Sequence, residues 1–178
     1  MKKVVLLGLT LLSAACVAAE DKTATLSVNG SVHQSSGCAV SLSRTSVDLG
    51  NQKIELLPAV ATSPTNTTSS VMVVASLTGA GCTDYTNTDN YYAHTALQFN
   101  GVADSTESTV LANTLSDDTA AKGVGVGLYT IDGTRFNINE NIPLSDGRFP
   151  FFIGMVKIND NASAGKVQSS LTVSVEHL

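Results

Sequence analysis

The sequence predicts an all-β protein that folds as a sandwich of two sheets. Apolar residues alternate with polar residues over many short segments, which indicates strands with one buried face. Clusters of Gly, Asn, Asp, Ser and Pro separate these segments at short spacing, as turns do. No segment has the periodicity of an amphipathic helix. About eight or more short strands without helices are typical of a β-sandwich.

The N-terminal segment has the features of an export signal. Lys2 and Lys3 precede an apolar run from Val4 to Ala15, and small residues then lead to a cleavage position before Glu20. The run is short for a membrane span, and the chain has no second run of this kind. We therefore expect residues 1–19 to be a cleaved signal peptide and the exported protein to begin at Glu20.

The three cysteines divide between the signal peptide and the exported protein. Cys16 belongs to the signal; a lipid-modified Cys16 is the alternative, although Ser13 stands where lipoprotein signals usually have Leu. Export places Cys38 and Cys82 in an oxidising compartment, so we expect a disulfide between them rather than two buried thiols. The chain-entropy model gives such a bond about 4 kcal/mol of stabilisation. Two cysteines without a cluster of other ligands make a poor zinc site.

The charge of the chain excludes two classes of partner. The net charge is −5 with only ten Lys plus Arg, and no basic cluster occurs beyond the signal peptide. Binding to nucleic acid or to an anionic membrane surface requires concentrated positive charge. We therefore expect neither partner.

The first strand of the exported protein alternates strictly. Thr, Ser and Asn fill its polar positions, and its other parity carries Ala24, Leu26, Val28, Gly30 and Val32. Most domains fray at their ends, so a long β-prone strand at the terminus needs an explanation. It pairs either within its own sandwich or with another copy, and the pattern alone leaves both open.

Four more strands are expected in the first half of the chain, at residues 38–42, 46–49, 52–57 and 70–77. Pro58 ends the third of these strands. The fourth is the most apolar run of the exported protein, which suits a strand buried on both faces.

The second half of the chain continues in the same way, with strands expected at residues 95–99, near Val110, and at 124–131, 134–138, 149–158 and 167–178. The dipeptide Asp132-Gly133 predicts a tight hairpin into residues 134–138. The last strand alternates apolar and polar residues up to the C-terminus.

Several segments in this order resemble the subunits of chaperone–usher pili, above all those of type 1 fimbriae. The resemblance covers essentially the whole exported chain, and it rests on the order and spacing of Val28–Val32, Gly37–Val40, Ser46–Gly50, Leu77–Cys82, Gly123–Val126 with Asp132-Gly133, and Ala162–Leu178. Gly165 is fourteenth from the C-terminus, where this family keeps a glycine.

The resemblance implies an incomplete immunoglobulin-like sandwich that lacks its seventh strand. A hydrophobic groove beside the last strand would accept a strand from a partner, with the groove residues Gly165, Val167, Leu171, Val173, Val175, His177 and Leu178. Residues 20–32 would be the donor-strand extension and residues 33–178 the pilin domain. A periplasmic chaperone would fill the groove first, and the extension of the next subunit would replace it at an outer-membrane usher. In an isolated copy we expect the extension to fold back and hide the groove.

One residue departs from the family pattern. His177 is next to last, where these pilins usually have tyrosine, which puts in doubt how tightly a chaperone grips this end. The other histidines, His33 and His94, are not adjacent to a nucleophile motif, and we expect no enzymatic activity. Asp117-Asp118 and Asp84 with Asp89 lack the spacing of a recognised calcium loop, so we expect no metal and no cofactor.

We therefore expect a structural subunit of an adhesive pilus, exported through the periplasm to the cell surface. The alternatives are a tip adhesin that binds a glycan and a periplasmic immunoglobulin-like binding module. Tip adhesins carry a receptor domain ahead of the pilin domain, and this chain has no room for one. Lateral binding through the loop at Tyr91-Tyr92 is a further alternative.

Overall fold

A computed structural model describes residues 25–30, 37–60, 70–82, 92 and 94–178. The expected signal peptide, Ala24, Val32, His33 and Tyr91 lie outside these residues. The strands are β1 (Thr25–Gly30), β2 (Ala39–Leu42), β3 (Ser46–Asp48), β4 (Ser70–Thr78), β5 (Thr95–Gly101), β6 (Val124–Thr130), β7 (Asn141–Pro143), β8 (Arg148–Lys157) and β9 (Gln168–His177). The described residues also contain two short 3-10 helices, η1 (Ile54–Leu56) and η2 (Ala80–Cys82), and no helix among these residues is long and apolar enough to cross a membrane.

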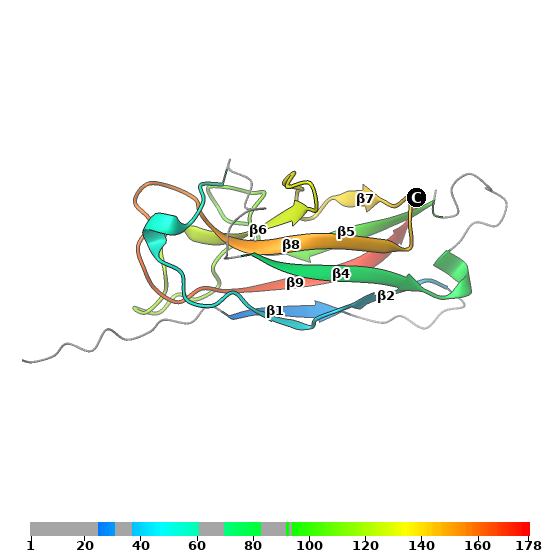
Figure 1. The fold of residues 1–178 in the computed structure, drawn as a ribbon, viewed down its shortest axis with the longest axis horizontal. Helices are drawn as coiled ribbons and strands as arrows, with labels where there is room; N and C mark the ends of the chain where they lie inside the picture. The colour runs from blue at the N-terminus through cyan, green and yellow to red at the C-terminus, as the bar shows by residue number, and fades with distance from the viewer. Residues whose placement is uncertain (1–24, 31–36, 61–69, 83–91, 93) are drawn as a thin grey trace, which may run out of the picture.

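The strands form two sheets that face each other (Figure 1), so the expected all-β sandwich is confirmed. One sheet has the order β3-β1-β9-β5-β7, and the other has the order β2-β4-β8-β6. The neighbouring strands pair antiparallel, with one exception: β1 runs parallel to β9. Two stacked sheets of this kind share one core between their inner faces.

The core consists of the inward residues of both sheets. On β9 the alternation is clear, because Leu171 and Val173 are fully buried while Thr172 between them is exposed. A group of phenylalanine rings fills the centre, with the ring of Phe99 4.9 Å from that of Phe136 and 5.0 Å from that of Phe151. Tilted and edge-on rings at these distances are a favourable aromatic arrangement.

A second apolar cluster lies on the outer face of the four-stranded sheet, over β6 and β8. It consists of Val110, Tyr129 and Val156, which are buried, with Val60 and Ile158 packed against them. Tyr129 lies back over its own strand: a Cβ atom at Gly127 would sit 2.5 Å from the phenol oxygen. Glycine at this position therefore makes room for the ring.

The expected disulfide is present. Cys38 and Cys82 are joined, with their Cα atoms 4.4 Å apart, and the bond links the start of β2 to the end of η2. Since η2 follows β4 and β2 pairs with β4, the bond fastens one end of this strand pair.

Two strand predictions are wrong. Residues 52–57 contain η1 in place of a strand, because Ile54 and Leu57 pack toward the core three positions apart, as in a helical turn. Strand β4 is buried on one face only, since Met72 on its other face is 50% exposed. The apolar run at residues 70–77 therefore contains more apolar side chains than the core buries.

The hairpin at Asp132-Gly133 is only partly formed. Thr130 N–H donates to the carbonyl of Thr134, and Tyr129 forms a single bridge with Arg135. Residues 134–138 form no strand, although the N–H of Phe136 still donates to the carbonyl of Leu128 on β6 at 3.2 Å. The ring of Phe136 lies in the aromatic core beside Phe99. The short strand predicted near Val110 is reduced to isolated bridges of Leu111 with Ala103 and Val126. Strand β7 was not predicted from the sequence.

Candidate functional site

Strand β1 occupies an unusual place in the five-stranded sheet. It lies between β3 and β9, pairing antiparallel with β3 and parallel with β9 (Figure 1). Three register pairs connect it to β3, and six connect it to β9, from Thr25–Gln168 to Gly30–Val173. The space between β3 and β9 that β1 fills is called the β1 slot.

The β1 slot is one strand wide. Adjacent strands are about 4.8 Å apart, so β3 and β9 face each other across about two such spacings. If β1 left, the facing N–H and C=O groups of both strands would lose their partners, and the core beneath would be open along one line. A sheet with such a gap accepts any extended segment of suitable length and side-chain pattern.

The buried residues at the edges of the β1 slot come from both walls. Val47 on β3 is 1% exposed, and Leu171 and Val173 on β9 are 1% and 0% exposed. Ser169 is also buried, and its hydroxyl is satisfied by donating to the carbonyl of Ala112 at 2.6 Å. The slot is therefore lined by apolar side chains and one hydrogen-bonded hydroxyl.

Comparison with known proteins shows the family to which this chain belongs. A model of the Fimbrial protein family matches residues 26–177. The chain belongs to the Fimbrial protein family. It is a pilus subunit and not an enzyme, it is a surface component of the fimbrium, and it interacts with other pilus subunits.

The chain is also similar to a solved structure of a fimbrial protein. The antigen and type I fimbria protein of Burkholderia pseudomallei is 16% identical to this fimbrial subunit, with a TM-score of 0.42, over 86% of this chain and 91% of that chain. No curated protein matched the chain.

The structure aligns part of the expected donor strand with the expected groove strand. The backbone register pairs Leu26 with Ser169 and Val28 with Leu171. Gly30 pairs with Val173. Three of the five expected donor positions thus stand opposite buried residues of β9, and the other two lie outside the described residues.

The C-terminal part of the expected groove strand is less buried. Val175 is partly buried, while His177 is exposed and pairs with Thr95, the first residue of β5. Leu178 is 57% exposed, and its N–H donates to the carbonyl of His94. Val175 still packs against the edge of the core, whereas His177 and Leu178 extend the strand to the surface.

Gly165 has a structural role ahead of β9. A Cβ atom at this position would lie 2.4 Å from the backbone nitrogen of Ala121 and 2.6 Å from the carbonyl oxygen of Thr119. Backbone atoms cannot move aside as the end of a side chain can. Glycine therefore lets two loops pack directly against each other, and it fixes where β9 begins.

The acidic pair at Asp117-Asp118 makes a local turn. Asp117 accepts hydrogen bonds from the N–H and hydroxyl of Thr119, and these bonds lower the pKa of its carboxyl group. Among the described residues, no group of three His, Cys, Asp or Glu side chains is placed to hold a metal.

The sequence alone did not indicate one wall of the slot. Residues 46–49 were expected as a short strand, but nothing in their pattern showed that β3 would lie across from β9. Val47 and Leu49 share one parity and are both buried, which is the signal that could have indicated an inward face.

Proposed function

We propose that this fimbrial subunit polymerises by donor-strand exchange, in which the extension of one copy enters the β1 slot of another. The observation that carries the proposal is the position of β1. This strand, close to the N-terminus of the expected exported protein, is held as the bridge between β3 and β9, and among the described strands β3 joins the sheet through β1. A strand inserted in this way can be replaced by an identical strand from a neighbour with no other change of fold.

The energetic basis is the same within a subunit and between subunits. An incoming strand again pairs with β9, which forms six register pairs with β1, and covers the buried residues Ser169, Leu171 and Val173. Each aliphatic side chain that it buries contributes about 1.5–3 kcal/mol before the cost of ordering the strand. A contact of this kind suits a lasting fibre, since no step of it needs turnover.

The domain division follows from this proposal. Residues 20–32 act as the donor extension and residues 33–178 form the acceptor domain, with residues 1–19 removed on export. A free subunit with an empty slot would expose a strand edge and apolar core, so a periplasmic chaperone protects it until an outer-membrane usher brings the next subunit. The assembled fibre contributes to adhesion at the cell surface.

Strand polarity offers a driving force for exchange. In its own slot β1 runs parallel to β9, along the longer of its two ladders. A strand from another copy is free to enter in the opposite direction, which makes the longer ladder antiparallel. Antiparallel pairing is slightly more stable per residue than parallel pairing, so the exchanged state would be favoured.

A locked variant tests the proposal. Ser27 and Ser170 are register partners, so cysteines at both positions would join β1 to its own slot on oxidation. We expect the oxidised Ser27→Cys/Ser170→Cys subunit to be absent from internal positions in fibres, while each single variant assembles normally. Normal assembly of the locked subunit would refute exchange of this strand.

A deletion gives an independent measurement. A subunit without residues 20–32 should bind a synthetic peptide of that sequence in a stable complex and should still be recovered with its chaperone. It should not occupy internal positions of a fibre, because it has no strand to donate. Mass measurement of the complex recovered from the periplasm would identify the cleavage site, the disulfide and the chaperone together.

A further inference from the structure

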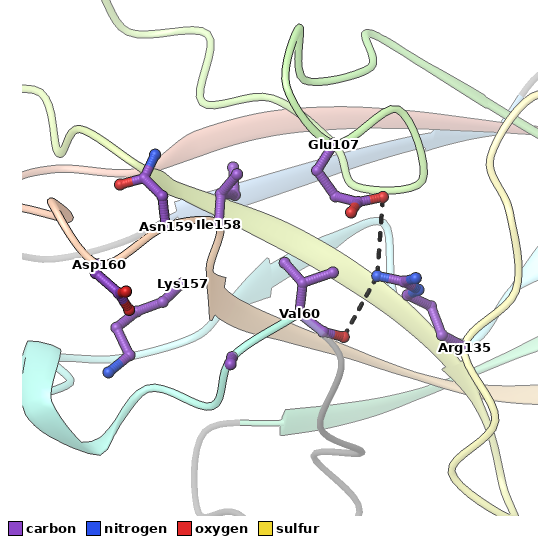
Figure 2. Close-up of a pocket in the computed structure, with 8 residues that line it drawn as sticks. Val60, Glu107, Arg135, Lys157, Ile158, Asn159 and Asp160 are labelled. Carbon is purple, nitrogen blue, oxygen red and sulfur yellow. Dashed lines mark hydrogen bonds and ion pairs between the residues drawn. The ribbon is translucent and has the colours of Figure 1, made fainter.

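A pocket opens on the outer face of the four-stranded sheet, away from the β1 slot. Its volume is about 320 Å³, at the lower end of the range for small-molecule sites, which is about 300–1,000 Å³. Figure 2 shows Val60 near its centre, with Arg135 and Glu107 on one side and Lys157 and Asp160 on the other. Four separate segments of the chain meet here.

The base of the pocket is apolar and firmly built. Val60 and Ile158 line it and also pack against the cluster of Val110, Tyr129 and Val156. Val60 is held to β8 by its N–H, which donates to the carbonyl of Lys157 at 3.1 Å, and the N–H of Ile158 donates to Gly123 at 2.9 Å. This base exists before any ligand arrives.

The polar rim is also fixed in place. The guanidinium of Arg135 donates to the carbonyl of Val60 at 3.3 Å and lies 3.9 Å from the carboxylate of Glu107. That carboxylate accepts bonds from the hydroxyl and N–H of Thr109. Arg135 has five N–H donors, and those not facing Val60 or Glu107 have no hydrogen-bond partner among the described residues.

The charges of the rim indicate what kind of ligand fits. Two cations, Arg135 and Lys157, are balanced by two anions, Glu107 and Asp160, so the pocket favours neither an anion nor a cation. A hydroxyl group can accept from a guanidinium and donate to a carboxylate at once, and it can therefore bridge the Arg135–Glu107 pair without breaking it. The aliphatic base would contact the C–H face of a ring that carries such hydroxyls.

We propose that this pocket binds a neutral, hydroxyl-rich ring compound of about the size of one hexopyranose. Arg135 and Glu107 hold neighbouring hydroxyls of the ring, Val60 and Ile158 contact its apolar face, and Asp160 accepts from a hydroxyl on the far side. The pocket and the β1 slot are on different sheets, so the site remains open after strand exchange and does not depend on the proposed function.

The test uses the folded, exported subunit and simple probes. Saturation-transfer NMR with methyl α-glucoside, methyl α-galactoside and methyl α-mannoside should show transfer to the C–H protons of at least one of them. Arg135→Gln should weaken that binding by about tenfold or more, and Asp160→Ala, on an exposed side chain, should weaken it several-fold. Arg148→Gln at the opposite end of β8 is the matched control and should leave binding unchanged. Thermal unfolding confirms that each variant is folded.

Three outcomes would overturn the proposal. The first is the absence of transfer to every neutral glycoside with the wild-type subunit. The second is stronger binding of glycine, a zwitterion, or of glucuronate, an anion, than of the neutral rings. The third is binding that survives Arg135→Gln and Asp160→Ala unchanged, which would place the ligand elsewhere.

Discussion

Gly165 and Ala121 are in direct backbone contact: a Cβ atom on Gly165 would lie 2.4 Å from the nitrogen of Ala121. The contact joins the loop before β6 to the loop before β9. Lys166 N–H donates to the carbonyl of Thr119 at 2.7 Å, and Ala121 N–H donates to the carbonyl of Lys166 at 2.9 Å. The position of β9 along its sheet therefore depends on this contact.

We predict that Gly165→Ala destabilises the subunit by about 1–3 kcal/mol, because the methyl group overlaps backbone atoms that must shift. Urea unfolding of the purified subunit measures the change. Ala164→Gly is the matched control, since Ala164 is exposed and the backbone contact with Ala121 is made by Gly165. An unchanged unfolding midpoint for Gly165→Ala would show that the loops can separate freely.

The β1 slot should be sensitive to charge on one face of β9 only. Val173 is 0% exposed, and a carboxylate there would be buried without a partner, at a cost of several kcal/mol. We expect Val173→Asp to abolish recovery of the chaperone complex from the periplasm. Thr172→Asp, on the exposed face of the same strand, should be recovered normally. Equal recovery of both variants would mean that partners do not use this slot.

The phenol of Tyr129 is a buried polar group without a partner. The side chain is 1% exposed, its hydroxyl makes no hydrogen bond within the described residues, and burial raises its pKa. We predict that Tyr129→Phe is neutral or stabilises the subunit by up to about 1 kcal/mol, since an unsatisfied buried hydroxyl costs about that much or more. Tyr129→Ala should cost about 3–5 kcal/mol. A loss on Tyr129→Phe, measured by urea unfolding, would reveal a hidden partner for the hydroxyl.

Glu107 should make the stability of the subunit depend on pH in the acidic range. The hydroxyl of Thr109 is the main cause of its lowered pKa, and Arg135 adds a smaller effect. A carboxyl whose pKa is lower in the folded state stabilises the protein above its unfolded pKa of about 4.5, and it loses this contribution as the pH falls through the folded value.

Thermal unfolding of wild type and Glu107→Gln measures this dependence. The wild type should be the more stable of the two at pH 7, and the difference should shrink below about pH 4.5. Because the side chain is about one-third exposed, the effect should be small and should weaken in high salt. If the difference in stability between the two proteins stays constant with pH, it arises from side-chain packing and not from the charge of Glu107.

Most strands could be predicted because alternation and turn residues are local signals. Residues 149–158 and 167–178 became β8 and β9 within a few positions. The strand predicted at residues 52–57 was wrong because Ile54 and Leu57 contact the core three positions apart, as in a helical turn. Which of these side chains reach the core depends on the tertiary structure and not on the local sequence. The prediction that residues 70–77 are buried on both faces was wrong at Met72, which is 50% exposed. An apolar side chain in a strand does not show by itself whether another layer of structure covers it.

The sites were predictable to different degrees. The pairing of residues 25–30 with β9 agrees with the family resemblance, but no sequence pattern gives the direction of β1 or identifies β3 as its other neighbour. The pocket on the other sheet had no sequence signal at all. Val60, Glu107, Arg135 and Asp160 come from distant segments, and each is unremarkable in its own stretch of chain.

The disulfide determines how this subunit would carry a mechanical load. In a fibre built by the proposed exchange, tension on a donated strand would enter the described part of the fold at Gly37 and Cys38, just before the four-residue edge strand β2. Without the covalent bond, that load would peel β2 away one hydrogen bond at a time. The bond to Cys82 passes the load instead to the end of β4, an inner strand paired along seven register positions with β8, where many hydrogen bonds resist in parallel.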